Sequence, residues 1–114
     1  MINALVTFHV ESGKVREFES IHRKLVQVMG GQDGCIEIKV HRSVRDPLEY
    51  MVYGTWENKE AWERAHRARE FKPLFSSLPI KNHPLSSGCF YLPAYDGKGM
   101  KAETNSPSAK RKRR

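Results

Sequence analysis

The chain has 114 residues and a formal net charge of +7, from 20 lysines and arginines against 13 aspartates and glutamates. This length suits one domain with a modest core and is too short for a catalytic domain plus a separate binding domain. No run of about 18 apolar residues could cross a membrane, and the N-terminus lacks the layout of a secretory signal, so we expect a cytoplasmic protein.

The positive charge is concentrated near the C-terminus. Residues 97–114 carry seven basic residues against one acidic residue, whereas residues 1–96 carry 13 against 12 and are almost neutral. We therefore expect a folded domain over residues 1–96, with no electrostatic footprint for a polyanion, and a disordered basic tail over residues 97–114. The tail is either a solvated segment that aids solubility or a weak, salt-sensitive contact to anionic surfaces or nucleic acid.

The first predicted strand covers residues 2–10, where side chains alternate with a period of two. One face is wholly apolar and comprises Ile2, Ala4, Val6, Phe8 and Val10, and the other comprises Asn3, Leu5, Thr7 and His9. A helix capped by Ser12 and ending at Gly30-Gly31 should follow, because apolar residues then recur every three or four positions. These positions are Val15, Phe18, Ile21, Leu25 and Val28.

Two further strands are predicted at residues 35–42 and 49–56, which are rich in β-branched and aromatic residues. The intervening Arg45-Asp46-Pro47-Leu48 is typical of a turn, since proline presets φ, so these strands should form an antiparallel hairpin.

The remaining elements are a helical region and a final strand. Asn58 should cap a helical region over residues 59–78, which Pro73 should break or kink. A strand is predicted at residues 88–95, at a sheet edge, because Pro93 cannot donate a ladder hydrogen bond.

The elements follow the order β-α-β-β-α-β, which predicts an α+β ferredoxin-like fold with a four-stranded antiparallel sheet. In the usual strand order of this fold, the second and fourth strands lie at opposite edges. A disulfide within one chain between Cys35 and Cys89 would therefore span an impossible distance. We interpret both cysteines as small buried apolar residues, and the alternative is a reactive thiol or a bridge between two chains.

A series of short segments between about residues 2 and 78 occurs in an informative order and spacing. They comprise Val10-Glu11-Ser12-Gly13-Lys14 before a helix with Phe18, Asp33-Gly34-Cys35, Arg42-Ser43, Asp46-Pro47, Thr55-Trp56-Glu57-Asn58-Lys59-Glu60-Ala61-Trp62, Ala65-His66 and Glu70-Phe71. Taken together, these segments resemble the antibiotic biosynthesis monooxygenases and their relatives.

The resemblance implies a homodimer in which two ferredoxin-like sheets face each other as a dimeric α+β barrel. Each chain would hold a small-molecule pocket between its sheet and its helices. Activities in the family include cofactor-independent oxygenation of phenols or quinols, haem degradation and isomerisation of small sugars. The fold therefore indicates the place of the site better than the reaction.

Haem degradation can be tested residue by residue. The haem-degrading branch of the family carries an asparagine, a tryptophan and a haem-ligating histidine, and aligning Ser12-Gly13 and Trp56 with that pattern places Val6, Ala65 and Phe75 at these positions. None of them matches, so haem binding is not expected.

The candidate site residues are side chains that the predicted faces bring towards one pocket. We expect the substrate pocket to be lined by Val6, Trp56, Trp62, Phe71 and Phe75. Trp56 can be a core residue and also a wall that stacks a planar substrate.

The histidines offer the candidate acid–base chemistry. His66 is a candidate general base that accepts a phenolic proton, and the alternative is a structural histidine that is hydrogen-bonded to a neighbour. His9 and His41 lie on the less apolar strand faces, where they either enter the interior of a barrel or are structural or solvated.

No carboxylate pair, phosphate-binding glycine loop, Ser/His/Asp arrangement or metal-ligand spacing is found, so no flavin, nicotinamide or metal cofactor is predicted. The favoured hypothesis is a cofactor-independent monooxygenase acting on a small aromatic or quinol substrate. The alternative is a non-catalytic small-molecule-binding or stress-associated domain of the same fold.

A strand face that carries Leu5, Met51 and Tyr53 is too apolar for solvent, which favours a homodimer.

Overall fold

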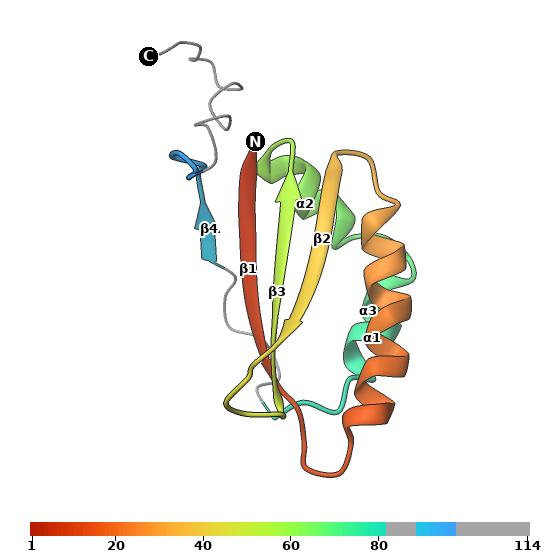
Figure 1. Ribbon diagram of the computed structural model, residues 1–114. Helices are drawn as coiled ribbons and strands as arrows, with labels where there is room; N and C mark the ends of the chain where they lie inside the picture. Colours follow the sequence, from red (N-terminus) through yellow and green to blue (C-terminus); the bar gives the residue numbers. More distant parts are fainter. Residues whose placement is uncertain (82–88, 98–114) are drawn as a thin grey trace.

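The computed structural model describes residues 1–81 and 89–97, in which helices and strands follow the predicted ferredoxin-like order (Figure 1). The elements are β1 (Ile2–His9), α1 (Val15–Gly30), β2 (Cys35–Arg42), β3 (Glu49–Trp56), α2 (Lys59–Ala65), α3 (Phe71–Ser76) and β4 (Cys89–Tyr91). The predicted basic tail lies outside the described residues, except for Gly97. No helix in the described part of the chain is long and apolar enough to cross a membrane.

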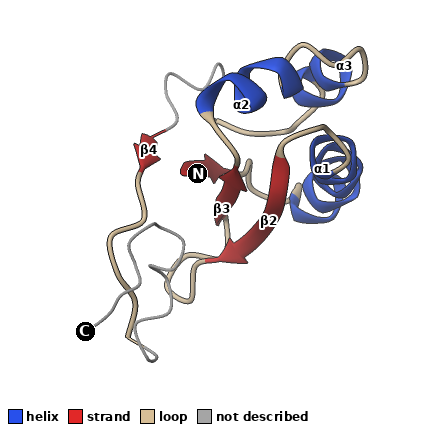
Figure 2. Ribbon diagram, turned by 90° about the horizontal axis from the view of Figure 1, so that it is seen from above, coloured by secondary structure: helices blue, strands red, loops and turns tan. Residues whose placement is uncertain are grey.

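The strands of residues 1–81 and 89–97 form one four-stranded antiparallel sheet in the order β2-β3-β1-β4. This confirms the predicted fold, with β2 and β4 at opposite edges. Helices α1, α2 and α3 lie on the same side of the sheet (Figure 2). On the covered face, Ala4, Val6 and Phe8 of β1 lie opposite Gly54, Val52 and Tyr50 of β3. The predicted apolar face of β1 is therefore the face that packs into the core.

Helix α1 differs from the prediction at its start and in its buried stripe. Lys14, not Ser12, occupies the N-cap position, and it makes no side-chain capping bond. The amide of Lys14 donates to the carbonyl of Glu11, so a turn that contains Ser12 precedes the helix. The buried positions are Phe18, His22, Leu25 and Met29, whereas Val15, Ile21 and Val28 of the predicted stripe are only half-buried. The predicted spacing of three or four residues is confirmed, but the stripe also contains His22, which was not among the predicted positions.

The predicted helical region at residues 59–78 is two helices. Asn58 caps α2 as predicted, since its Oδ1 accepts a hydrogen bond from the amide of Ala61 at 2.8 Å. The helix ends at Ala65, well before Pro73, and His66 occupies the C-cap position. Pro73 lies in the first turn of α3, where a missing amide hydrogen breaks no helical bond. The prediction of a break at Pro73 was therefore wrong.

The C-terminal strand is shorter than predicted. Strand β4 ends at Tyr91, so Pro93 lies beyond the sheet, and Gly88 and residues 82–87 lie outside the described chain. Cys89 is exposed on this edge strand, which contradicts its interpretation as a buried residue, whereas Cys35 is half-buried and burial raises the pKa of its thiol. Both cysteines are free thiols within the described residues.

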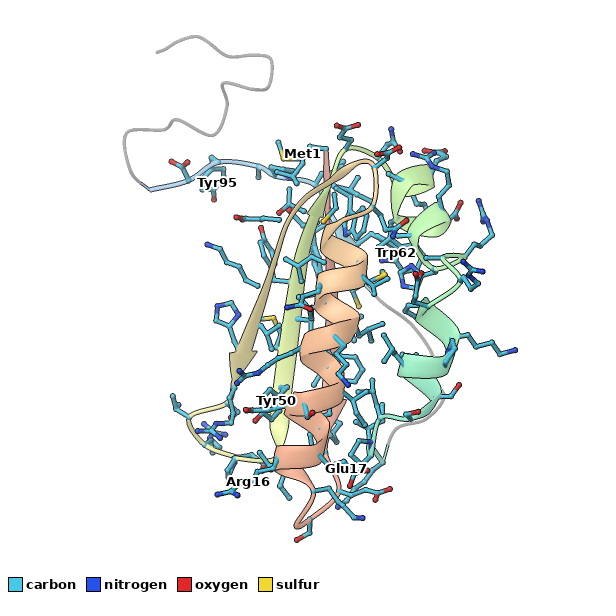
Figure 3. All side chains as sticks on the ribbon, turned by 90° about the vertical axis from the view of Figure 1, so that its right-hand side faces the viewer. Met1, Arg16, Glu17, Tyr50, Trp62 and Tyr95 are labelled. Carbon is cyan, nitrogen blue, oxygen red and sulfur yellow. The ribbon has the colours of Figure 1, made fainter. Side chains whose placement is uncertain are left out.

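A cluster of rings fills the core where α1 crosses Tyr50 on β3. The Tyr50 and Phe18 rings are 4.8 Å apart, and the hydroxyl of Tyr50 donates a short hydrogen bond to Oε2 of Glu19. This bond lowers the pKa of Glu19, whereas burial, together with this bond, raises the pKa of Tyr50. Figure 3 shows Tyr50 and Trp62 towards opposite ends of the molecule, and the candidate site lies nearer the Trp62 end.

Candidate functional site

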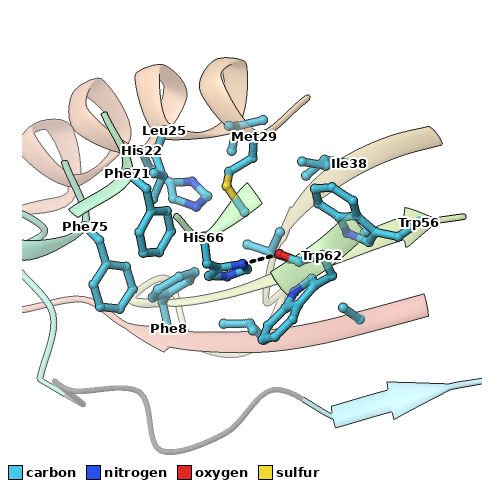
Figure 4. A pocket seen from close by; sticks show the side chains of 15 residues that line it. Phe8, His22, Leu25, Met29, Ile38, Trp56, Trp62, His66, Phe71 and Phe75 are labelled. Carbon is cyan, nitrogen blue, oxygen red and sulfur yellow. Dashed lines mark hydrogen bonds between the residues drawn. The ribbon is translucent and has the colours of Figure 1, made fainter. Parts of the chain in front are cut away.

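A cavity of about 100 Å³ lies between the helices and the sheet (Figure 4). Every pocket residue proposed from the sequence lines it: Val6, Trp56, Trp62, His66, Phe71 and Phe75. The other lining residues are Ala4, Phe8, His22, Leu25, Val26, Met29, Ile38, Val52 and Gly54. The walls are therefore almost entirely apolar or aromatic, as is usual for small-molecule sites.

The sheet forms one wall of the cavity, and Gly54 allows the indole of Trp56 to lie close against this sheet. A Cβ atom on Gly54 would approach Nε1 of Trp56 to 2.8 Å, so only glycine leaves room for the indole in this position. Trp56 is 2 % exposed and also lines the cavity, so it serves both as a core residue and as a pocket wall.

A line of aromatic rings from α2 and α3 forms the opposite wall. Trp62 and His66 have ring centroids 4.1 Å apart, His66 and Phe71 are 4.7 Å apart, and Phe71 stacks on Phe75 at 5.3 Å. Because Trp62 and His66 are four residues apart, one face of α2 presents both rings to the cavity. A flat aromatic ligand would meet ring faces and edges here, which are favourable contacts.

The hydrogen bond of His66 fixes which of its nitrogens can act as a base. Nδ1 of His66 lies 2.7 Å from the carbonyl oxygen of Trp62. A carbonyl only accepts, so Nδ1 carries the hydrogen and Nε2 keeps a free lone pair in the neutral ring. Burial lowers the pKa of His66, partly opposed by this hydrogen bond. The ring is therefore neutral at pH 7, with Nε2 able to take a proton.

A second histidine, which the sequence reasoning missed, borders the same cavity. His22 of α1 is 5 % exposed and stacks on Phe18, with ring centroids 4.9 Å apart and planes 16° apart. Its ring also meets Phe8 edge-on at 5.2 Å. Burial lowers the pKa of His22 to about 4. Its helical spacing from Phe18 and Leu25 was the signal in the sequence that pointed to this position.

The remaining candidates lie elsewhere. His9 and His41 are exposed and are not among the residues that line the cavity. Their predicted place inside a barrel needs a second chain and stays a prediction. Among the residues that the structure describes, no group of three His, Cys, Asp or Glu side chains is placed to hold a metal ion.

Acid should destabilise the protein, because His22 is buried in its neutral form. Between pH 6.5 and about 4, the unfolded chain binds a proton at His22 that the folded chain does not. The free energy of unfolding should therefore be highest above pH 6.5 and fall by about 3 kcal/mol towards pH 4. Urea unfolding at a fixed protein concentration measures this, and His22→Leu should flatten the pH dependence. If the free energy of unfolding of His22→Leu depended on pH as strongly as that of the wild type, His22 would not be the cause of the acid sensitivity.

Comparison with known proteins agrees with the fold. A model of the family described as antibiotic biosynthesis monooxygenase matches residues 1–75. No curated protein matches. Several solved structures do match, at sequence identities that speak for the fold alone.

One similar structure is SnoaB of Streptomyces nogalater, a cofactor-independent oxygenase, with 21% identity, a TM-score of 0.66, and coverage of 84% of this chain and 94% of SnoaB. Another is a conserved protein from Methanosarcina mazei, with 20% identity, a TM-score of 0.68, and coverage of 79% and 87%. A third is Rv0793 from Mycobacterium tuberculosis, with 9% identity, a TM-score of 0.71, and coverage of 85% and 98%. The family match spans most of the described fold, and the chain therefore belongs to the antibiotic biosynthesis monooxygenase family.

Proposed function

We propose that the protein is a cofactor-independent monooxygenase that oxidises a small phenol or quinol in the cavity beside Trp56 and Trp62. The observation that carries the proposal is the state of His66. Its Nδ1 hydrogen is held by the carbonyl of Trp62, so Nε2 is the nitrogen with a free lone pair, and the imidazole lines an aromatic cavity. A neutral imidazole in such a place is suited to accept the proton of a phenolic hydroxyl.

The reaction needs no bound oxidant other than dioxygen. Transfer of the hydroxyl proton to Nε2 of His66 makes an electron-rich phenolate, which reduces dioxygen and forms a carbon–oxygen bond at a ring carbon. The resulting peroxide loses water, so that ring carbon changes from C–H to C=O. One oxygen atom stays in the product and the other leaves as water, and the substrate supplies all the electrons.

The dimensions of the cavity favour a small substrate. Its volume of about 100 Å³ is of the same order as the roughly 150 Å³ apolar cavity that binds benzene in an engineered protein. The aromatic walls favour a planar ring over a flexible or charged molecule. A single-ring phenol or quinol is therefore the first class to test.

Oxygen uptake with a panel of phenols and quinols, followed by identification of the products, tests the proposal. Protein-dependent uptake above the rate with heat-denatured protein, together with a product that is one oxygen atom richer, would support it. Tight binding of a panel member that is recovered unchanged after aerobic incubation would favour the non-catalytic binding domain instead.

We also propose that the protein is a homodimer. Leu5 and Tyr53 are paired across β1 and β3 on the face of the sheet opposite the helices, and Met51 lies on the same face. All three side chains are only half-buried in the single chain. A second copy that packs against this face would remove their apolar surface from water.

A charged side chain at this face should therefore weaken the dimer. Leu5→Lys should shift the protein towards monomer or aggregate, because it would bury an unpaired charge at the interface. Light scattering coupled to gel filtration measures the mass, with Lys24→Glu on the exposed side of α1 as the control for a change of charge. A compact, fully active wild-type monomer at micromolar concentration would refute the dimer.

A further inference from the structure

His22 is a buried polar side chain that borders the cavity. It is 5 % exposed, yet neither ring nitrogen makes a hydrogen bond with any residue that the structure describes. Buried polar atoms are nearly always hydrogen-bonded, so an unpaired one needs an explanation. Its neighbours Phe8 and Phe18 contact the ring only through their aromatic surfaces.

The position of His22 points to a ligand as the missing partner. His22 comes from α1, whereas His66 comes from the end of α2, and both border the same cavity. Figure 4 shows the two imidazole rings entering this space from different elements. The surrounding walls are mainly apolar, so these imidazoles are its main sources of hydrogen bonds, with the indole N–H groups of Trp56 and Trp62 as donors only.

We propose that His22 is a specificity-determining residue that hydrogen-bonds a second polar substituent of the ring held at His66. The inference rests on the proposed function, because it takes the cavity as the substrate site. A neutral imidazole offers one donor and one acceptor, so a second hydroxyl or a carbonyl oxygen can satisfy it. A ring with a single hydroxyl uses that group at His66. It then has no polar group left for His22, whose ring nitrogens remain without a hydrogen bond. Sites built in this way discriminate strongly against the analogue that lacks the polar group.

Binding of hydroquinone and of phenol under argon tests the inference, with tryptophan fluorescence or calorimetry as the readout. The wild-type protein should prefer hydroquinone by about 5- to 150-fold, which is the range expected for one satisfied hydrogen bond in a buried site. His22→Leu, which keeps a similar volume, should lose this preference because its affinity for hydroquinone falls. His22→Gln, which restores a donor and an acceptor, should recover part of the preference.

Two controls separate selectivity from structural damage. Val26→Ala changes another residue of α1 that lines the cavity, so it should alter both affinities by a similar factor. The melting temperature of His22→Leu should be equal to or above that of the wild type, because the variant removes an unpaired buried polar group. A fall in melting temperature together with equal losses for both ligands would give His22 a purely structural role and overturn the inference.

The outcomes also distinguish this inference from the proposed function. A preference for hydroquinone that disappears in His22→Leu, without oxygen uptake by the wild type, would support the inference and refute the monooxygenase. Oxygen uptake by a wild type that binds hydroquinone and phenol with equal affinities would support the monooxygenase and refute the inference about His22. Failure of the wild type to bind either ligand would overturn the role of His22.

Discussion

Replacing His66 by alanine should reduce kcat for oxygen uptake by about 10²- to 10⁴-fold, the usual contribution of a general base. In the proposed reaction, Nε2 of His66 takes the phenolic proton and the indole rings of the cavity bind the substrate. The variant lacks this base but keeps the indole rings. KM should therefore change much less than kcat. Steady-state oxygen consumption with the best substrate of the panel measures both.

Two further variants make the His66 experiment specific. His66→Asn retains a side-chain donor for the carbonyl of Trp62 but offers no base, so it should be as slow as the alanine variant. Glu63→Ala, an exposed position one turn earlier on α2, should keep the wild-type rate. Near-normal turnover by His66→Asn would show that the residue is structural.

If His66 is the general base, its protonation state determines how the rate depends on pH. His66 must be unprotonated to act, and burial lowers its pKa below the usual 6.5. The value of kcat/KM should therefore be constant around pH 7 and fall in acid, with a midpoint below pH 6.5. A rate that rises steeply above pH 7 would indicate ionisation of the phenol in solution, without help from His66.

Gly34→Ala should lower the free energy of unfolding by about 2–5 kcal/mol, from unfavourable backbone geometry and overpacking together. Gly34 has a φ of +89°, and a Cβ atom there would lie 2.4 Å from Cβ of Ala61 on α2. Ala61 is 1 % exposed, so it has little room to move away. Displacement of α2 would also move Trp62 and His66, so activity should fall with stability. Chemical denaturation at a fixed protein concentration measures the loss.

Matched variants isolate the contact between Gly34 and α2. Gly30→Ala, at the end of α1, meets no atom within 4 Å and should be neutral or slightly stabilising. Adding Ala61→Gly to Gly34→Ala should recover part of the lost stability, because it removes the clashing methyl group. Equal stability of Gly34→Ala and Gly30→Ala would contradict the close packing of α2 against this turn.

Much of the pocket could be predicted because periodicity determines which face a residue occupies. Alternation along residues 2–10 placed Val6 on the covered face, and the parity of Trp56 with Val52 placed the indole on the same face. The spacing of four residues placed Trp62 and His66 on one face of the predicted helical region. These assignments needed only the regular geometry of strands and helices.

The errors arose where local rules competed with packing or with chain geometry. His22 was left out because the buried stripe of α1 was assumed to be wholly apolar, although its spacing fits that stripe. Pro73 has the chemistry of a helix breaker, yet it lies in the first turn of α3, where proline is tolerated. Ser12 has the right chemistry for a cap, but the turn closed by Glu11 and Lys14 precedes the helix.

The state of His66 could not be derived from the sequence at all. It depends on a side-chain rotamer at the end of α2 that brings Nδ1 to 2.7 Å from the carbonyl of Trp62. The close approach of Trp56 to Gly54 is likewise a property of the packed structure, since it depends on where the indole lies over the sheet.

Isotope labelling decides whether one atom of dioxygen is inserted into a phenol or quinol, as the proposed function requires. The purified protein is incubated with hydroquinone under oxygen-18 gas, and the quinone product is analysed by mass spectrometry. We expect a hydroxyquinone that carries one oxygen-18 atom, with the second labelled atom recovered in water, at a rate that depends on His66. An unlabelled quinone accompanied by hydrogen peroxide, or no turnover of any phenol or quinol, would contradict the proposed function.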